Sequence, residues 1–304
     1  MQYLTLLIGF ILLIKGADYF VEASSAVARA LRIPSIIIGL TIVAFGTSAP
    51  ELAVSTTAAL SGSNEIAIGN VIGSNIFNLL VVLGACGLIS PFIVQLRWDY
   101  VASIGVAIAV LVMVIRDNYI SRLNAVLLLL GFAVFVALTI RDALNNRTCD
   151  SEEVKKMPVI KCIIYIIGGL MAIVYGGDLV VDSSKAIALS FGLSETLIGL
   201  TVVALGTSLP ELITSIVASR KGENGIALGN VVGSNIFNVL MVLATSAFIH
   251  PMSIQHTAII DTIYLIIASA VVWVLCRLGM KLSRVDGFIM VAMYSVYLVY
   301  ICVR

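Results

Sequence analysis

The sequence predicts an all-α integral membrane protein whose ten transmembrane helices form two inverted repeats of five helices each. Composition is the first reason, because 60% of the 304 residues are hydrophobic and 12% are charged, about half the charged share of a soluble domain. The second is a series of apolar runs that are long enough to cross a bilayer. The third is an internal duplication, in which one stretch of the chain recurs at a constant offset of 160 residues.

The apolar runs are separated by charged and turn-forming residues, and each run predicts one helix. Helices are favoured because β-barrel strands would be about ten residues long and would alternate apolar with polar residues. The first run follows no basic residue and precedes no clear small-residue cleavage site, so we expect a retained helix rather than a secretory signal. The ten expected spans are residues 3–20, 35–60, 66–90, 100–115, 123–140, 160–181, 196–219, 226–249, 258–276 and 285–301.

Basic residues are distributed unequally between the loops, and this predicts the orientation of the chain. The loops after odd-numbered spans carry 13 Lys and Arg residues, whereas the opposite side carries 4. Because positive residues remain in the cytoplasm, we expect both termini to lie outside, in a multi-pass protein of the cell (cytoplasmic or inner) membrane. A polar cytoplasmic linker, residues 142–159, would then join the first repeat, residues 1–141, to the second, residues 160–304.

Charge and cysteine content argue against several other classes of function. A net charge of +1 gives no indication of nucleic-acid binding. The five cysteines show no metal-binding spacing such as C-x-x-C. The sequence contains no recognisable nucleophile–base pair and no H-E-x-x-H motif, so we do not expect an enzyme. We expect the lipid bilayer as the surroundings of the chain, no cofactor, and no obligatory protein partner.

The duplicated stretch occupies residues 39–83 and 199–243, where 29 of 45 aligned positions are identical without a gap. Each copy places a glutamate, Glu51 or Glu211, directly after a proline within an apolar segment. A charge in hydrocarbon costs about 3 kcal/mol or more, so an ionisable residue there indicates a function. Paired apolar segments interrupted by Gly and Pro at corresponding positions are typical of a transporter's binding site. Because five spans is an odd number, the second repeat would enter the membrane from the opposite face.

The first copy predicts a helix break beside Glu51. Pro50 lacks an amide hydrogen and its ring clashes with the carbonyl of Gly46, so we expect carbonyls of the preceding turn, from Ala44 onward, to be freed or tilted toward a polar cavity. Thr47 and Ser48 precede the glutamate by four and three residues and share its helix face. The same patch of hydroxyl, carbonyl and carboxylate oxygens recurs in the second copy as Thr207, Ser208 and Glu211.

The span that follows adds Ser74 and Asn78, which lie four residues apart on one helix face. Asn75 is offset from that face and either binds an ion or bonds a neighbouring helix. Oxygen ligands suit hard cations such as Ca²⁺ or Na⁺, and the absence of His and Cys near the site argues against zinc or copper. Two carboxylates would balance one Ca²⁺ or serve several Na⁺ in turn. The second copy supplies Ser234, Asn235 and Asn238 in the same pattern.

Other polar residues of the stretch permit a purely structural interpretation. Ser, Thr and Asn side chains in membrane helices often only bond neighbouring helices. We interpret Ser55, Thr56, Thr57 and Asn64 in this way. The interpretation fails for the two glutamates, because no basic partner lies near either of them in sequence.

The motifs G-T-S-x-P-E and G-S-N-I-F-N, at residues 46–51 and 73–78 and again at 206–211 and 233–238, resemble the paired α-repeats of the calcium/cation antiporter superfamily. Within it, the chain is similar to the compact prokaryotic sodium/calcium exchangers over all ten spans. The resemblance implies that spans 2, 3, 7 and 8 are broken helices around a diamond of four sites for Ca²⁺ and Na⁺. The implied ligands are Glu51, Thr47, Ser48, Ser74, Asn78 and the Ala44 carbonyl, with Glu211, Thr207, Ser208, Ser234, Asn238 and the Ala204 carbonyl.

The resemblance also implies the activity, a secondary antiporter that exchanges Ca²⁺ for Na⁺ by alternating access as spans one and six slide across the site. Gradient energies favour about three Na⁺ per Ca²⁺, because two would fall short of the cost of expelling one Ca²⁺. Asn238 stands where potassium-dependent relatives carry Asp, which argues against potassium co-transport. A Ca²⁺/H⁺ (cation/proton) antiporter on the same fold and, as a different class, a passive cation channel remain as alternatives.

Overall fold

The computed structural model describes residues 2–94, 97–146, 157–191 and 206–303. Most of them are helical, as the sequence predicts. Eight of the described helices are long and apolar enough to cross a membrane, or up to nine when the bent pair of residues 35–47 and 49–60 is taken as one span. The expected seventh span, residues 196–219, lies partly outside the described residues, and the predicted total of ten is not reached within them.

Helices and π-helical segments follow one another with short connections, and two-residue strands occupy four of the described loops. In chain order, the elements are α1 (Gln2–Leu31), α2 (Ser35–Ile38), η1 (Gly39–Val43), α3 (Ala44–Thr47), α4 (Ala49–Leu60), α5 (Asn64–Phe77), η2 (Asn78–Val82), α6 (Leu83–Ile89), β1 (Phe92–Ile93), α7 (Trp98–Asp117), β2 (Tyr119–Ile120), α8 (Arg122–Asn145), α9 (Val159–Ser190), α12 (Leu209–Arg220), α13 (Asn224–Phe237), η4 (Asn238–Leu243), α14 (Ala244–Ile249), β3 (Met252–Ser253), α15 (His256–Gly279), β4 (Lys281–Leu282) and α16 (Arg284–Val303).

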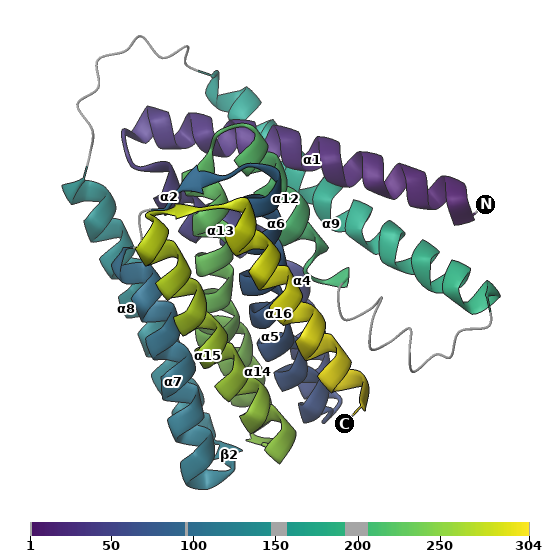
Figure 1. Ribbon diagram of the computed structural model, residues 1–304, viewed down its shortest axis with the longest axis vertical. Helices are drawn as coiled ribbons and strands as arrows, with labels where there is room; N and C mark the ends of the chain where they lie inside the picture. The colour runs from purple at the N-terminus through teal and green to yellow at the C-terminus, as the bar shows by residue number, and fades with distance from the viewer. Residues whose placement is uncertain (1, 95–96, 147–156, 192–205, 304) are drawn as a thin grey trace.

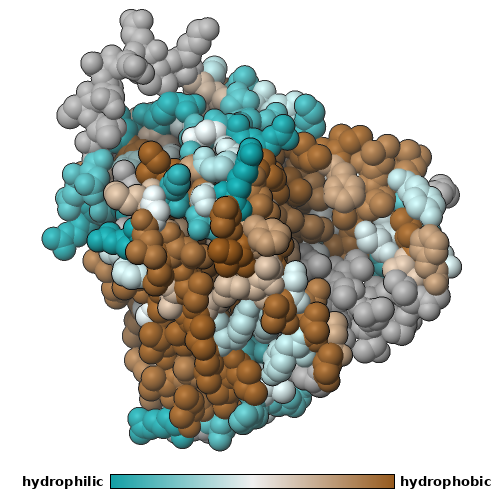
Figure 2. All heavy atoms as spheres, viewed as in Figure 1, coloured by the Kyte–Doolittle hydropathy of each residue, from teal (hydrophilic) through white to brown (hydrophobic). Residues whose placement is uncertain are grey.

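On the face of the molecule shown in Figure 2, an apolar belt lies between polar residues at the two ends of the helical bundle. Large hydrophobic side chains such as Leu130, Ile164 and Val296 are exposed on the outward faces of α8, α9 and α16. A soluble protein rarely exposes a continuous apolar surface of this extent. The belt therefore matches the hydrocarbon of a bilayer, and the chain is a multi-pass membrane protein.

Helices α1 and α9 lie side by side and extend together away from the other helices (Figure 1). Glycines set their separation at two crossings. A Cβ atom built on Gly16 would lie 2.8 Å from the carbonyl oxygen of Gly169, and one built on Gly169 would lie 2.8 Å from the carbonyl oxygen of Gly16. Gly9 and Gly176 repeat this arrangement at 2.9 Å. The two backbones are therefore in direct contact, as small residues allow in membrane helix pairs.

Both helices of this pair are longer than the sequence predicts. The expected spans, residues 3–20 and 160–181, end just before Glu22 and Asp182, whereas α1 runs to Leu31 and α9 to Ser190. A helix needs only local backbone hydrogen bonds and can continue past the apolar run into polar surroundings. The apolar run therefore marks the membrane part of each helix, not its ends.

The second expected span is broken as predicted. Residues 35–47 and 49–60 form two helices bent by 46°, and Ser48 at the break has a φ of −86° and a ψ of 9°. Ser208 precedes α12 with nearly the same backbone angles, a φ of −93° and a ψ of 6°. Each of these helices has its proline in the first turn, where the missing amide hydrogen costs no intrahelical bond.

Spans three and eight are not broken, so this part of the prediction is wrong. Residues 64–89 and 224–249 are each one helix of 26 residues. Each contains a π-helical segment that begins at an asparagine, Asn78 in η2 and Asn238 in η4. Their glycines are not followed by proline, so nothing removes a backbone hydrogen bond, and the helix widens over one turn instead of bending.

The short strands tie the two halves of the chain together. β1 pairs antiparallel with β4, with Phe92 opposite Leu282. β2 pairs antiparallel with β3, with Ile120 opposite Met252. The loops after the third and ninth expected spans are thereby joined, and so are the loops after the fourth and eighth. This agrees with the odd and even sides that the distribution of basic residues predicts.

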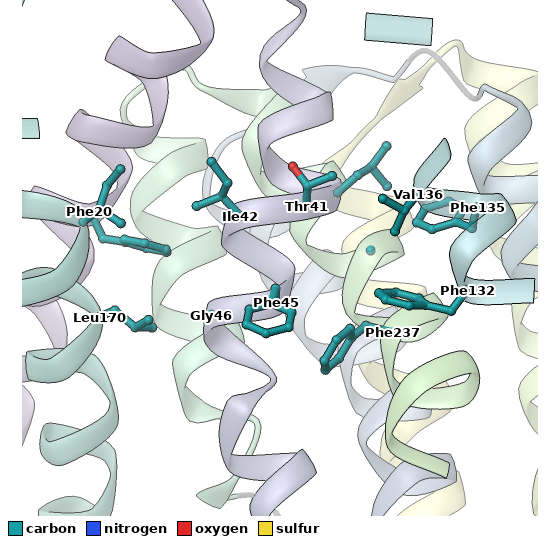
Figure 3. A pocket seen from close by; sticks show the side chains of 13 residues that line it. Phe20, Thr41, Ile42, Phe45, Gly46, Phe132, Phe135, Val136, Leu170 and Phe237 are labelled. Atoms are coloured by element: carbon teal, nitrogen blue, oxygen red, sulfur yellow. The ribbon is translucent and has the colours of Figure 1, made fainter. Parts of the chain in front are cut away.

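An apolar cavity of about 380 Å³ lies between α1, α3, α8, α9 and α13 (Figure 3). Phe45, Phe132 and Phe237 line one part of it, with the ring of Phe237 edge-on to both others at 5.2 and 5.7 Å between ring centres. Among the described lining residues, Gly46 alone belongs to the duplicated G-T-S-x-P-E motif. None of the described residues that line this cavity carries a carboxylate, so the two buried glutamates form a separate site.

Candidate ion-binding site

Glu51 and Glu211 are buried in the middle of the protein, and both are 0% exposed. Each lies in the first turn of its helix, α4 or α12, directly after the break at Ser48 or Ser208. Neither takes part in the ion pairs found among the described residues. The positive end of a helix dipole favours a carboxylate at this position. Both copies of the duplicated stretch use this arrangement.

Serines connect each glutamate to the opposite copy of the duplicated stretch. Ser48 donates its hydroxyl hydrogen to Glu211 Oε1 at 2.8 Å, and Ser208 donates to Glu51 Oε1 at 3.1 Å. Ser234 adds a longer bond to Glu211 Oε1 at 3.5 Å. The sequence predicts that Ser48 and Glu51 share one patch. In the structure, each serine instead bonds the glutamate of the other copy, so the two acids belong to one site.

Several buried oxygens around the two acids lack a hydrogen-bond partner. An unsatisfied buried polar group costs about 1–3 kcal/mol, and such groups are rare in native proteins. Oxygens of carboxylates, amides and hydroxyls are the ligands that Ca²⁺ and Na⁺ take. A hard cation therefore fits this donor set. The unpaired oxygens include Glu51 Oε2, Glu211 Oε2, Ser74 Oγ, Asn78 Oδ1, Asn235 Oδ1 and Asn238 Oδ1.

Asn75 and Asn235 each bond the helix of the other, which is one of the two roles left open by the sequence. The Asn75 side chain donates to the backbone carbonyl of Asn235 at 3.1 Å, and Asn235 donates to the carbonyl of Asn75 at 3.2 Å. Asn238 donates to Asn75 Oδ1 at 3.1 Å. Helices α5 and α13 thus meet at the same residue of each copy, as they would on a twofold axis.

The threonines of the motif contact a pair of asparagines that the sequence analysis did not assign to the site. Thr47 donates to Asn230 Oδ1 at 3.0 Å, and Thr207 donates to Asn70 Oδ1 at 3.3 Å. A signal was available, because both asparagines are identical at the 160-residue offset. Spacing alone could not reveal their partners, since each bond crosses from one copy to the other.

Of the two backbone carbonyls that we expected to bind the ion, only that of Ala44 belongs to the described residues. The Ala44 carbonyl is not freed, because it accepts a hydrogen bond from the Ser48 amide at 3.0 Å. It could reach an ion only through its second lone pair. Ala204, the corresponding residue of the second copy, lies outside the described residues. Ser55 takes the structural role expected for it, since it donates to the Ala67 carbonyl of α5 at 3.5 Å.

Known proteins share both the sequence and the fold of this chain. Residues 1–141 and 161–303 match the family described as sodium/calcium exchanger protein. The sodium/calcium exchanger MaX1 of Methanosarcina acetivorans is 33% identical, over 98% of this chain and 97% of that protein. The putative antiporter CaxA of Alkalimonas amylolytica is 38% identical, over 96% of this chain and 95% of that protein.

A solved structure of the sodium-calcium exchanger NCX_Mj, from crystals soaked without Na⁺ and Ca²⁺, superimposes with a TM-score of 0.87. The two sequences are 32% identical, and the match covers 99% of this chain and 98% of the other. The family match extends over nearly the whole chain, and its relatives are transporters rather than enzymes. The chain belongs to the sodium/calcium exchanger family of membrane antiporters.

Proposed function

We propose that this protein exchanges Ca²⁺ for Na⁺ across the membrane, with both ions bound between Glu51 and Glu211. The observation that carries the proposal is the pair of buried carboxylates, which serines from opposite halves hold together and which keep unpaired oxygens. Together they carry two negative charges, which one Ca²⁺ neutralises. Since Na⁺ would use the same oxygens, binding of one ion excludes the other, and this competition is the basis of exchange.

The proposed ligands include oxygens from both halves of the chain. The carboxylates of Glu51 and Glu211 supply the charge, and neutral hydroxyl, amide and carbonyl oxygens complete the shell, as is usual for hard cations. The described members of this set are buried, apart from the half-buried Thr207. The remaining proposed ligands are Thr47, Thr207, Ser48, Ser208, Ser74, Ser234, Asn78, Asn238 and the carbonyls of Ala44 and Ala204.

The arrangement of the site supports an architecture of two inverted repeats. We infer ten spans in two five-helix repeats, residues 1–141 and 160–304, joined by a cytoplasmic linker, residues 142–159, with both termini outside. The matching bounds of α4 with α12 and of α5 with α13, at an offset of 160 residues, support the repeat. The reciprocal bonds between Asn75 and Asn235 support a twofold relation between the halves.

Alternating access requires one part of the protein to move past the site. The α1–α9 pair is the proposed moving part, because its helices contact each other through glycine backbones and can move as one body. Inverted repeats support this mechanism, since exchanging the conformations of the two halves exchanges the side that is open. Each ion then crosses the membrane in its own step.

The number of Na⁺ ions follows from gradient energies. For a 10⁴-fold inward Ca²⁺ gradient and about 100 mV, inside negative, expelling one Ca²⁺ costs about 10 kcal/mol. Two Na⁺ entering down a tenfold gradient release about 7 kcal/mol, and three release about 11 kcal/mol. Three Na⁺ are therefore sufficient, and the exchange would then move one net positive charge per cycle.

Uptake of ⁴⁵Ca²⁺ into Na⁺-loaded proteoliposomes tests the coupling ion. We expect rapid uptake when external Na⁺ is low, and no uptake when a pH gradient replaces the Na⁺ gradient. With three Na⁺ leaving for each Ca²⁺ that enters, an inside-positive potential, set with valinomycin and external K⁺, should accelerate uptake. Uptake that follows the pH gradient would indicate a cation/proton antiporter. Uptake that needs no internal counter-ion would indicate a channel.

A further inference from the structure

Two asparagines outside the proposed ligand set make the same three contacts in each half of the protein. Asn70 on α5 donates one side-chain hydrogen to Ser55 Oγ at 2.9 Å and the other to the backbone carbonyl of Glu51 at 3.3 Å. Asn230 on α13 donates to Ser215 Oγ at 2.9 Å and to the carbonyl of Glu211 at 3.4 Å. Each asparagine is therefore attached to the helix that carries the glutamate of its own half.

The third contact reaches the opposite half. The oxygen of Asn70 accepts the hydroxyl hydrogen of Thr207, and the oxygen of Asn230 accepts that of Thr47. Both hydrogens of each asparagine amide are already engaged, which determines the orientation of the amide group. The amide oxygen is thereby aimed at the threonine, and each asparagine links one half's glutamate helix to the other half's threonine.

This arrangement determines what the threonine hydroxyl can offer to a cation. A hydroxyl group has one hydrogen to donate and two lone pairs that can accept. Because its hydrogen is directed at the asparagine, both lone pairs of the threonine oxygen remain free. Without the asparagine, the hydrogen could turn toward the cation or toward a carboxylate. In either orientation, the hydroxyl would be a poorer ligand.

We propose that Asn70 and Asn230 are positioning residues of the ion site, which orient Thr207 and Thr47 so that each presents its oxygen to the transported cation. The inference rests on the proposed function only for the presence of a cation at this site. It assigns the two asparagines a function beyond joining helices, because each bond crosses between the halves that together form the site. Partners that orient metal ligands in this way typically contribute about tenfold to a hundredfold in metal affinity.

A double-mutant cycle on purified full-length protein in detergent tests the proposal, with equilibrium ⁴⁵Ca²⁺ binding as the measurement. We expect Asn70→Ala and Thr207→Val each to weaken binding about tenfold. If Asn70 acts through Thr207, the double variant should bind Ca²⁺ no more weakly than Thr207→Val alone. Asn230→Ala with Thr47→Val forms the equivalent cycle in the other half and should behave in the same way.

Asn146→Ala is the control, because the only described partner of Asn146 is Asp142 at the exposed end of α8. The Ca²⁺ affinity of this variant should equal that of the wild type. Should Asn70→Ala fail to fold, Asn70→Ser takes its place, because the serine side chain is too short to reach Thr207.

A roughly hundredfold loss of Ca²⁺ affinity in the double variant would mean that the two residues act independently, and it would overturn the proposal. An unchanged affinity in both single asparagine variants would overturn it as well. The cycle measures binding alone, so it does not test the exchange. A wild-type protein that binds Ca²⁺ but shows no Na⁺-driven uptake would contradict the proposed exchange and not the role of the asparagines.

Discussion

Glutamine in place of Glu51 or of Glu211 is expected to abolish Na⁺-dependent Ca²⁺ uptake. Each change leaves one carboxylate to face a divalent ion in a buried site, so the bound state carries an uncompensated positive charge. Removing one partner of a buried charge pair costs about 3–5 kcal/mol, which corresponds to a loss of more than about a hundredfold in affinity. The measurement is the initial rate of ⁴⁵Ca²⁺ uptake into Na⁺-loaded proteoliposomes, per unit of folded protein.

Glu65→Gln is the matched control for both variants. Glu65 lies in the first turn of α5, is exposed, and contacts Gln255 at the surface. Its replacement removes the same charge without touching the site, and uptake should stay at the wild-type rate. Because serines from each half bond the glutamate of the other, both site variants should fail alike. Normal uptake by either one would show that the proposed site is wrong.

Valine in place of Gly169 is expected to lower transport at least tenfold. A side chain there would meet the carbonyl oxygen of Gly16 at 2.8 Å and the backbone nitrogen of Phe20 at 3.0 Å. Backbone atoms cannot move aside as the end of a flexible side chain can, so α9 must separate from α1. Overpacking of this kind costs about 1–3 kcal/mol, and it disrupts the pair that we propose moves across the site.

The neighbouring residue offers a close control for this prediction. Gly168 lies on the same helix, and a Cβ atom there would meet no described atom within 4 Å. Gly168→Val makes the same change in helix propensity but leaves the contact with α1 intact. The uptake rate should fall for Gly169→Val only. The same should hold for thermal stability, measured as the temperature at which the purified protein loses its monodisperse peak in size-exclusion chromatography. Equal behaviour of the two variants would contradict the proposed role of the glycine contact.

The parts of the fold that depend on local chemistry could be predicted from the sequence. Apolar runs predicted most of the long helices among the described residues, because a backbone that crosses lipid must satisfy its own hydrogen bonds, which favours helices. The proline before Glu51 predicted the break at Ser48, and the cost of a charge in hydrocarbon indicated that both glutamates have a function. The 160-residue offset predicted that every such feature would occur twice.

The contacts between the two copies could not be predicted in this way. Helical periodicity shows that Ser48 and Glu51 lie on one face, but it does not say which helix lies opposite that face. The structure shows Ser48 bonded to Glu211, and Thr47 bonded to Asn230. The π-helical segments were missed for a similar reason, since nothing in the local sequence distinguishes a widened turn from a regular one.

The location of a bound divalent cation tests the central claim most directly. Crystals of the full-length protein soaked with Sr²⁺, which scatters anomalously and stands in for Ca²⁺, should show a strong anomalous peak inside the bundle. We expect this peak to lie about 2.3–2.6 Å, the range for Ca²⁺ ligands, from carboxylate oxygens of both Glu51 and Glu211. A peak that contacts only one of the two glutamates, or only acidic residues at the surface, would contradict the account.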